Sequence, residues 1–184
     1  MEWKIPGTVH SCPQDQAPQL AQQFASMFLG GGMVLSQVSG ITGLEAYTIQ
    51  NWVKRGFLSP PVKKRYQLNQ LCRIITINML KSVLPMDRIC GLLTYINGDL
   101  DDESDDLIDD AVLYFMFVRI AAQAQSLPAG SSPAPLIARE LRDYQEPVPG
   151  AKARVEQVLH IMLIAWAAAS LQQQAEAMLD SLEN

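Results

Sequence analysis

The stretch LSQVSGITGLEAYTIQNWVKRGFL, residues 35–58, has the spacing of two short helices joined by a tight turn. Apolar side chains recur every three or four residues on both sides of Gly43, which gives each helix one face to bury. Gly43 can adopt the positive φ angle that a short helix-to-helix turn often requires. The stretch therefore predicts a helix-turn-helix whose second helix spans residues 45–54. The expected buried residues are Leu35, Val38 and Ile41 in the first helix and Ile49, Trp52 and Val53 in the second.

The second helix leaves a polar face exposed. Gly56 suits the position just beyond the helix, and the two cations at 54 and 55 suit a helix C-terminus. The polar side chains of this face are long enough to reach base edges or phosphates when a helix lies in the major groove of DNA. The candidate DNA-binding residues of this helix are Tyr47, Thr48, Gln50, Asn51, Lys54 and Arg55.

A basic segment, FLSPPVKKRY, follows at residues 57–66. Pro60 and Pro61 stop any helix, and three consecutive cations and a tyrosine come next. This order predicts a small β-hairpin wing over residues 62–66 with a basic tip. Its cations are expected to contact phosphates or the minor groove. The candidate DNA contacts of this segment are Lys63, Lys64, Arg65 and Tyr66.

The two segments together resemble the winged helix-turn-helix of MerR-type regulators. That pattern is roughly G-v-s-x-x-T-[IL]-R-x-[YW]-x-x-x-G-L-[IL]-x-P, followed by a wing that ends in Tyr-Arg. The chain departs from it at Tyr47, Gln50 and Gln67, where the family usually places arginines, so fewer phosphate contacts are expected. The whole chain, with its acidic second half, looks like the bacterial family known as domain of unknown function 1836. The residues that match the MerR pattern are Gly43, Thr48, Ile49, Trp52, Gly56, Leu58 and Pro60.

Charge is distributed unevenly along the chain. The 184 residues carry a net charge of −5, but residues 33–98 carry 8 cations against 2 acids, or +6, which leaves −5 − 6 = −11 for the rest. A basic segment joined to an acidic one is the charge layout of a DNA-contacting head and a body that stays clear of DNA. We expect three parts: an N-terminal arm and helix at 1–32, a DNA-binding head at 33–98, and an acidic helical body at 99–184 for dimerisation or effector binding.

The rest of the chain predicts further helices, so the expected fold is mainly α: a MerR-like winged head and an all-helical body. Residues 1–16 are expected to be a loose lead-in, and the three glycines at 30–32 a hinge. A phosphate cradle at these glycines is the less favoured interpretation, because they lack the Lys-Ser/Thr of a P-loop. The expected helices span 18–29, 70–83 (capped by Asn69), 86–97, 99–125, 136–144 and 151–181.

Eight acids crowd residues 99–110. A calcium loop is excluded, since Ser104 replaces the glycine needed at the sixth position and Asp110 replaces the glutamate needed at the twelfth. The alternative is a helix whose N-terminal turns and wet face hold the acids. Ala111, Val112 and Phe115 are then expected to face inward along that helix.

The last helix is apolar on nearly every side between residues 158 and 171, which is typical of a helix at the centre of a bundle or at a contact with a second subunit. Met162 and Trp166 are candidates for an effector pocket, although core packing is the commoner role of such residues. Five residues have the 3,4 spacing of a helix-pair seam. They are Val155, Val158, Met162, Ala165 and Ala169.

The sequence contains no recognisable catalytic, metal-binding or cofactor-binding pattern. The three cysteines are isolated, and His10 and His160 have no ligand partners at a telling spacing. Unpaired thiols and the lack of a signal peptide favour the cytoplasm. The apolar run of 14 residues at 158–171 is shorter than the roughly 20 that a membrane span needs.

The expected function is a sequence-specific regulator that binds double-stranded DNA. The MerR resemblance implies that it acts as a homodimer and distorts a promoter, with a small molecule or a protein as effector on its helical body. The alternative is a protein–protein interaction module built on the same scaffold without DNA binding. An enzyme is not expected.

Overall fold

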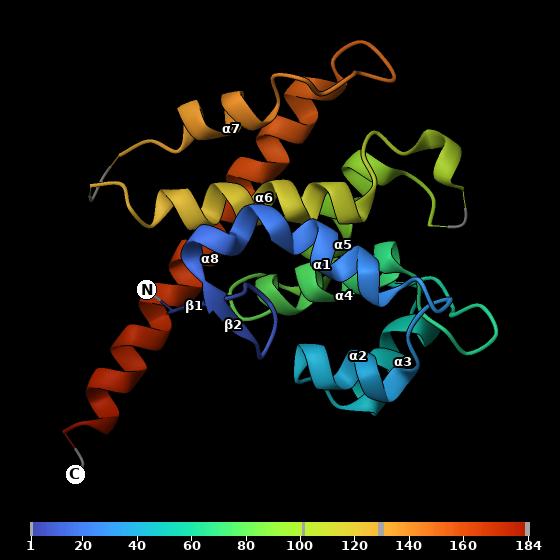
Figure 1. The fold of residues 1–184 in the computed structure, drawn as a ribbon, viewed down its shortest axis with the longest axis horizontal. Helices are drawn as coiled ribbons and strands as arrows, with labels where there is room; N and C mark the ends of the chain where they lie inside the picture. The colour runs from blue at the N-terminus through green and yellow to red at the C-terminus, as the bar shows by residue number, and fades with distance from the viewer. Residues whose placement is uncertain (1, 101, 129–130, 183–184) are drawn as a thin grey trace.

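The computed structural model describes residues 2–100, 102–128 and 131–182, and these form a mainly helical fold with a small two-stranded antiparallel sheet (Figure 1). The expected fold class, mainly α, is confirmed. The elements in chain order are β1 Glu2–Lys4, β2 Ser11–Pro13, the 3₁₀ helix η1 Gln14–Gln19, α1 Leu20–Met27, α2 Leu35–Thr42, α3 Ala46–Lys54, α4 Leu68–Leu80, α5 Met86–Asn97, the 3₁₀ helix η2 Glu103–Asp105, α6 Asp110–Ala124, α7 Ala134–Glu140 and α8 Ala151–Asp180.

The N-terminal segment is ordered, and the expectation of a loose lead-in was wrong. β1 and β2 pair antiparallel, with Trp3 opposite Cys12. Trp3 and Ile5 are both buried in the core, and the hydroxyl of Thr8 donates a 3.0 Å hydrogen bond to the carbonyl of Ile5 across the intervening turn. Two apolar residues in alternation are too short a pattern to indicate a strand, so only the tertiary contacts show why this segment folds.

The two short helices expected within residues 35–54 are present as α2 and α3. Gly43 follows α2 with φ 70°, and Gly56 follows α3 with φ 72°. Val38, Ile49 and Trp52 are buried, as their spacing predicted. The remaining three expected core residues, Leu35, Ile41 and Val53, are half-buried at the edge of the same cluster.

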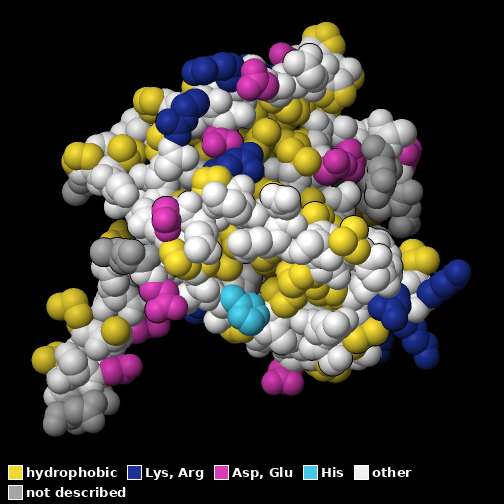
Figure 2. Space-filling model, in the orientation of Figure 1, with side chains coloured by type: hydrophobic (Ala, Val, Ile, Leu, Met, Phe, Trp, Pro, Cys, Tyr) yellow, Lys and Arg dark blue, Asp and Glu magenta, His cyan; other side chains and the backbone are white. Residues whose placement is uncertain are grey.

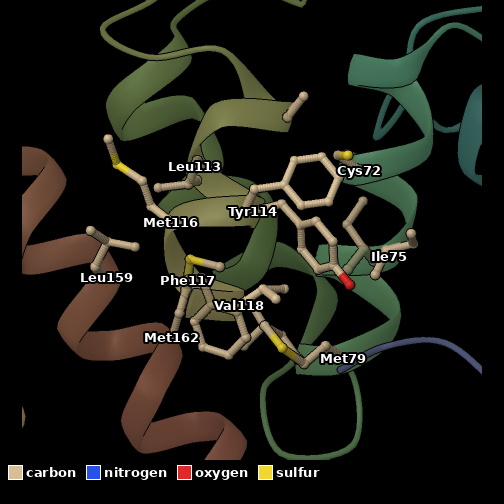
Figure 3. Close-up of a cluster of buried hydrophobic side chains, with 14 of the residues drawn as sticks. Cys72, Ile75, Met79, Leu113, Tyr114, Met116, Phe117, Val118, Leu159 and Met162 are labelled. Atoms are coloured by element: carbon tan, nitrogen blue, oxygen red, sulfur yellow. The ribbon is translucent and has the colours of Figure 1, made fainter. Parts of the chain in front are cut away.

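The core lies where α4, α6 and α8 meet. Figure 3 shows side chains from all three helices in one cluster, among them Ile75, Phe117 and Met162. Tyr114 is fully buried, and its hydroxyl donates a 2.9 Å hydrogen bond to the carbonyl of Pro6. The N-terminal segment is thereby attached to the centre of the fold.

The start of α4 differs from the prediction. Asn69 does not cap this helix, because α4 begins at Leu68 after the N-cap Gln67, whose N–H donates to the side chain of Gln70 at 2.9 Å. Asn69 instead accepts a 3.3 Å hydrogen bond from the N–H of Ala111, in the first turn of α6. It therefore caps a neighbouring helix, a role that only the tertiary structure reveals.

The acidic run is mostly a loop, so the helix expected from residue 99 begins only at Asp110. Within the loop, Asp side chains accept hydrogen bonds from nearby backbone N–H groups: Asp105 from Asp99 at 3.1 Å and Asp102 from Ser104 at 2.9 Å. Aspartates favour such local bonds over helix continuation, which explains the late start. Val112, expected to face inward, is 43% exposed. Asp101 lies outside the described residues.

Helix α8 has two unlike halves. Its first half packs in the core, and the five residues of the expected helix-pair seam, Val155 to Ala169, are buried against this same chain. Its second half projects from the body (Figure 1), and every residue from Leu171 to Leu182 is exposed. By length and composition, α8 is the one described helix that could cross a membrane, with 39% of its most apolar window buried.

Candidate nucleic-acid interface

The outward face of α3 carries most of the polar residues singled out in its sequence. Tyr47, Gln50 and Lys54 are exposed, whereas Thr48 and Asn51 are half-buried. Ile49 and Trp52 lie on the opposite face in the core and fix the rotation of the helix about its axis. Arg55 is exposed beyond the helix end, with its guanidinium 4.5 Å from the centre of the Phe57 ring.

Residues 62–65 form a tight hairpin turn, which we name the basic turn. Val62 and Arg65 make an antiparallel bridge, and the N–H of Arg65 donates to the carbonyl of Val62 at 2.9 Å. The two residues between them have positive φ angles, 50° for Lys63 and 63° for Lys64. This is the backbone of a type I′ hairpin turn, in which Asn-Gly is the favoured pair. Both lysine side chains are exposed at the tip.

The base of the basic turn is tied to the segment before α2. Met33 and Tyr66 exchange two backbone hydrogen bonds of 2.9 and 2.8 Å. Arg65 donates from Nη1 to the carbonyl of Gly32 at 2.8 Å. Tyr66 is only 3% exposed, so its ring offers little surface to DNA, contrary to its prediction as a DNA contact, although it lines the groove beside the basic turn.

Three elements meet at one groove of about 770 Å³. Its walls come from the first turn of α2 (Leu35), from α3 (Gln50 and Lys54) and from the basic turn (Lys64), and none of the described acids lines it. The N-terminus of α2 adds the partial positive charge of a helix dipole, and its N-cap, Val34, offers no side-chain oxygen to the free N–H groups. Figure 2 shows Lys and Arg side chains gathered at the right-hand edge, over α3 and the basic turn. The groove is therefore suited to an anionic backbone.

Arg73 is a residue whose role the sequence did not show. It counts among the cations of residues 33–98, but it is 4% exposed. Its Nε donates to the carbonyl of Phe57 at 3.1 Å, and its Nη1 lies 3.3 Å from Oδ2 of Asp110. Asn97 donates to the other oxygen of Asp110. Arg73 thus joins the loop after α3 to the start of α6, and it is not accessible to DNA.

The carboxyl group of Asp110 is buried beside this arginine. Burial raises the pKa of Asp110 above its ordinary value, and the guanidinium of Arg73 opposes that rise. No position in the acidic run distinguished Asp110 from its neighbours in sequence. Its partner on α4 is 37 residues away in sequence, so only the fold brings the two together.

The two candidate effector residues lie in different surroundings. Met162 is fully buried in the core, whereas Trp166 is half-buried and packs edge-to-face on Phe117, with ring centres 6.1 Å apart. Trp166 also lines a cavity between α8 and the N-terminal loop. Within the described ranges no group of three or more His, Cys, Asp or Glu side chains could hold a metal ion.

Comparison with known proteins adds a family and a relative. A family model described as "Domain of unknown function (DUF1836)" matches residues 23–117, just over half of the chain, including α2, α3 and the basic turn. The "Uncharacterized protein YkrK" of Bacillus subtilis (strain 168) is 30% identical over 84 residues, covering 44% of this chain and 36% of that protein. The chain therefore spans little more than a third of that relative. No solved structure matches this chain.

Proposed function

The chain belongs to the DUF1836 family, and we propose that its matched region is a MerR-like winged helix-turn-helix that binds double-stranded DNA. In this proposal α3 enters the major groove, and the basic turn acts as the wing and contacts the phosphate backbone. The protein is then a cytoplasmic transcription regulator.

One observation carries the proposal: the polar face of α3, the N-terminus of α2 and the basic turn line one groove that holds no acid among the described residues. Gln50 and Lys54 extend from the middle and end of α3, at the lengths needed to reach base edges and phosphates. Lys64 lies across the groove from them. None of the described acids of residues 99–110 lines this groove, although Asp99 and Asp106 line a separate pocket together with Ser59.

The backbone of the basic turn gives further support. Two non-glycine residues in the left-handed region cost about 1 kcal/mol each, and such strain tends to persist where function requires it. Asn-Gly would relieve the strain, yet the tip carries Lys63 and Lys64. Two lysines at strained positions support a role for positive charge at this tip, and contact with phosphate is such a role.

We also propose that the regulator is a homodimer joined through an exposed stripe that runs along α8 and just past its end, from Ile161 to Leu182. Apolar residues recur there at alternating intervals of three and four, the spacing of a two-helix seam. The large side chains of this stripe are exposed, Ile164 at 63% and Leu171 at 66%. The positions beside the stripe are uncharged, so nothing repels a second copy. The stripe consists of Ile161, Ile164, Ala168, Leu171, Ala175, Met178 and Leu182.

A dimer also meets an energetic need of the DNA proposal. Tyr47, Gln50 and Gln67 replace the arginines of the MerR pattern, so one head has few phosphate contacts. A single small module forms a limited DNA interface. Two heads on one duplex double the number of contacts and permit a usable affinity.

The test is duplex binding across a salt series, with DNA taken from the flanks of the coding region. The variant Lys63→Ala/Lys64→Ala/Arg65→Ala, called the tip variant, removes the two charges at the tip of the basic turn and the one at its base, and Arg139→Ala/Arg142→Ala/Lys152→Ala removes as many cations elsewhere. Wild-type binding should weaken steeply with salt, and the log–log slope should flatten by about 0.9 for every phosphate that the tip variant no longer neutralises. The control should keep the wild-type slope. Weak binding that is insensitive to salt would favour the protein–protein interaction module.

A further inference from the structure

A cavity of about 400 Å³ lies where the N-terminal loop, the α2–α3 turn, the end of α4 and the middle of α8 meet. This volume falls within the range of small-molecule pockets. It is separate from the groove along α3, because the two share no lining residue among those described.

The charged side chains that line this cavity are all cationic. Lys4 and Lys81 contribute them, and no described Asp or Glu is among the lining residues. Lys81 is exposed on one side, and partial burial on its cavity side lowers the pKa of its ammonium group. A partly desolvated cation without a neighbouring carboxylate attracts an anion more strongly than a surface lysine does.

Two tryptophans give the cavity an aromatic wall. Trp166 packs edge-to-face on Phe117 at an interplanar angle of 85°, which holds its ring in place. Trp3 is 4% exposed, and its indole N–H is buried without a hydrogen-bond partner among the described residues. An unpaired buried donor costs on the order of 1–3 kcal/mol, so an acceptor that reached it would gain binding energy.

From these features we propose that the cavity binds a small organic anion that carries a planar apolar ring. The ring packs against Trp166, and the anionic group is held by the Lys81 ammonium and by the Trp3 indole N–H, which a small shift of the Trp3 ring brings to the cavity surface. An aromatic carboxylate or sulfonate has this chemistry and fits the volume.

The cavity also touches the α2–α3 turn. Thr42 and Gly43 line it, and the side chain of Asn78 donates 2.9 Å hydrogen bonds to the carbonyls of both Thr42 and Gly7. An occupant therefore contacts the N-terminal loop and the turn that positions α3. A regulatory effect on DNA affinity rests on the proposed function, whereas anion binding does not.

Binding is tested without DNA, with 1-anilinonaphthalene-8-sulfonate as the probe and the full chain as the protein. Probe fluorescence should rise to saturation at one probe per chain. Lys81→Gln should weaken the affinity for the probe at least tenfold. Trp3→Phe, which removes the indole N–H but keeps an aromatic side chain, should weaken it by as much. The control Lys152→Gln should bind as wild type does.

The probe could also bind the apolar stripe on α8, so Ile164→Glu/Leu171→Glu is titrated in parallel. Unchanged affinity in this variant, with weaker binding in Lys81→Gln, supports the cavity. Weaker binding in the stripe variant with unchanged affinity in Lys81→Gln overturns the proposal, and so does the absence of saturable binding to wild type. Because Lys81 is exposed in part, its substitution tests the site even if Trp3→Phe does not fold.

Discussion

At the scale of single residues, the Arg73–Asp110 pair shows how charge is used inside this fold. The two side chains are 5% and 15% exposed, and their atoms lie 3.3 Å apart. Removing two charges from water is costly, so such a pair adds little net stability, yet breaking it leaves one buried charge without compensation. The pair therefore serves to fix the loop after α3 relative to α6.

Asp110→Asn should lower the free energy of unfolding by about 3 kcal/mol, because it leaves the Arg73 guanidinium buried without a countercharge. Urea unfolding at pH 7 measures the decrease. The matched control is Glu140→Gln, which breaks the 2.9 Å pair with Arg119, a side chain that is 27% exposed. That decrease should stay near or below about 1 kcal/mol. Equal decreases in both variants would mean that Arg73 regains water when its partner is removed.

Stability at alkaline pH should depend on Tyr114. Burial raises the pKa of this phenol well above its ordinary value. Above about pH 10 the unfolded chain loses this proton while the folded chain keeps it, so the stabilisation is complete below that pH and is lost as pH rises. The decline in unfolding free energy from pH 8 to pH 11 should be about 1 kcal/mol smaller in Tyr114→Phe than in wild type.

The control for this titration is Tyr47→Phe, which removes an exposed hydroxyl and should leave the alkaline decline as it is in wild type. Tyr114→Phe should also be about 1 kcal/mol less stable at pH 8, because the carbonyl of Pro6 no longer has its donor. An unaltered alkaline decline in Tyr114→Phe would show that this phenol ionises in the folded state.

Residue-level prediction from sequence succeeded where the local period decides the outcome. Ile49 and Trp52 are buried and Tyr47 is exposed because a helix with one apolar stripe has no other arrangement. The sequence did not predict the contacts that Asn69, Tyr66 and Arg73 make. The partners of these three lie on other elements, at Ala111, Met33 and Asp110, and no local pattern encodes them.

At the scale of elements, the turn between α2 and α3 was predictable because a glycine readily adopts the positive φ angle that such a turn needs, and Gly43 has φ 70°. The structure of the acidic run was not predictable, because two effects oppose each other there. The helix dipole favours a helix that begins with acids, whereas the local hydrogen bonds of aspartate favour a loop. The structure shows that the local hydrogen bonds prevail in the loop before Asp110, and the helix begins where Asp110 is buried. The N-terminal strands were missed because three residues carry too little pattern.

The basic turn allows charge and backbone strain to be separated. Lys63→Asn/Lys64→Gly gives the favoured type I′ pair and should raise the unfolding free energy by about 1 kcal/mol. Lys63→Gln/Lys64→Gln removes the same charges without relieving the strain, so its stability should remain near that of wild type. Both variants should bind DNA more weakly and to the same extent, measured by fluorescence anisotropy. A variant that binds DNA as wild type does would exclude the basic turn from the interface.

At the scale of the whole molecule, one hydrophobic core includes residues of both the basic part, residues 33–98, and the acidic part, residues 99–184. Helix α4, from the basic part, packs directly on α6 and α8 of the acidic part. The N-terminal segment seals this interface through the bond between Tyr114 and Pro6. Helix α2 also packs on α4, so the α2–α3 turn and the acidic part are connected through contiguous packed helices. The length of α8 was predictable from its composition, but which of its faces stays uncovered depended on where α4 and α6 pack.

The uncovered stripe on α8 predicts a specific dimer. An antiparallel pair places large side chains opposite smaller or flexible ones: Ile161 opposite Met178, Ile164 opposite Ala175, and Ala168 opposite Leu171. This alternation fills the seam without voids.

Sedimentation equilibrium should therefore show a dimer for wild type and a monomer for Ile164→Glu/Leu171→Glu. Both substituted positions are exposed within one chain, so the fold should be retained. The control Leu29→Glu/Val148→Glu adds the same charge at exposed positions elsewhere and should remain dimeric. The monomeric variant should bind a duplex with two half-sites more weakly than the control does.

Cysteine cross-linking determines the direction of the pair. In a Cys12→Ser/Cys90→Ser background, oxidising a mixture of Ile161→Cys and Met178→Cys chains should join unlike chains, because an antiparallel seam brings these two positions together. A parallel seam would instead join like chains in each separate preparation. A wild-type monomer that sediments with phosphatidylglycerol vesicles would refute the dimer, since the same stripe and the length of α8 would then serve a lipid surface.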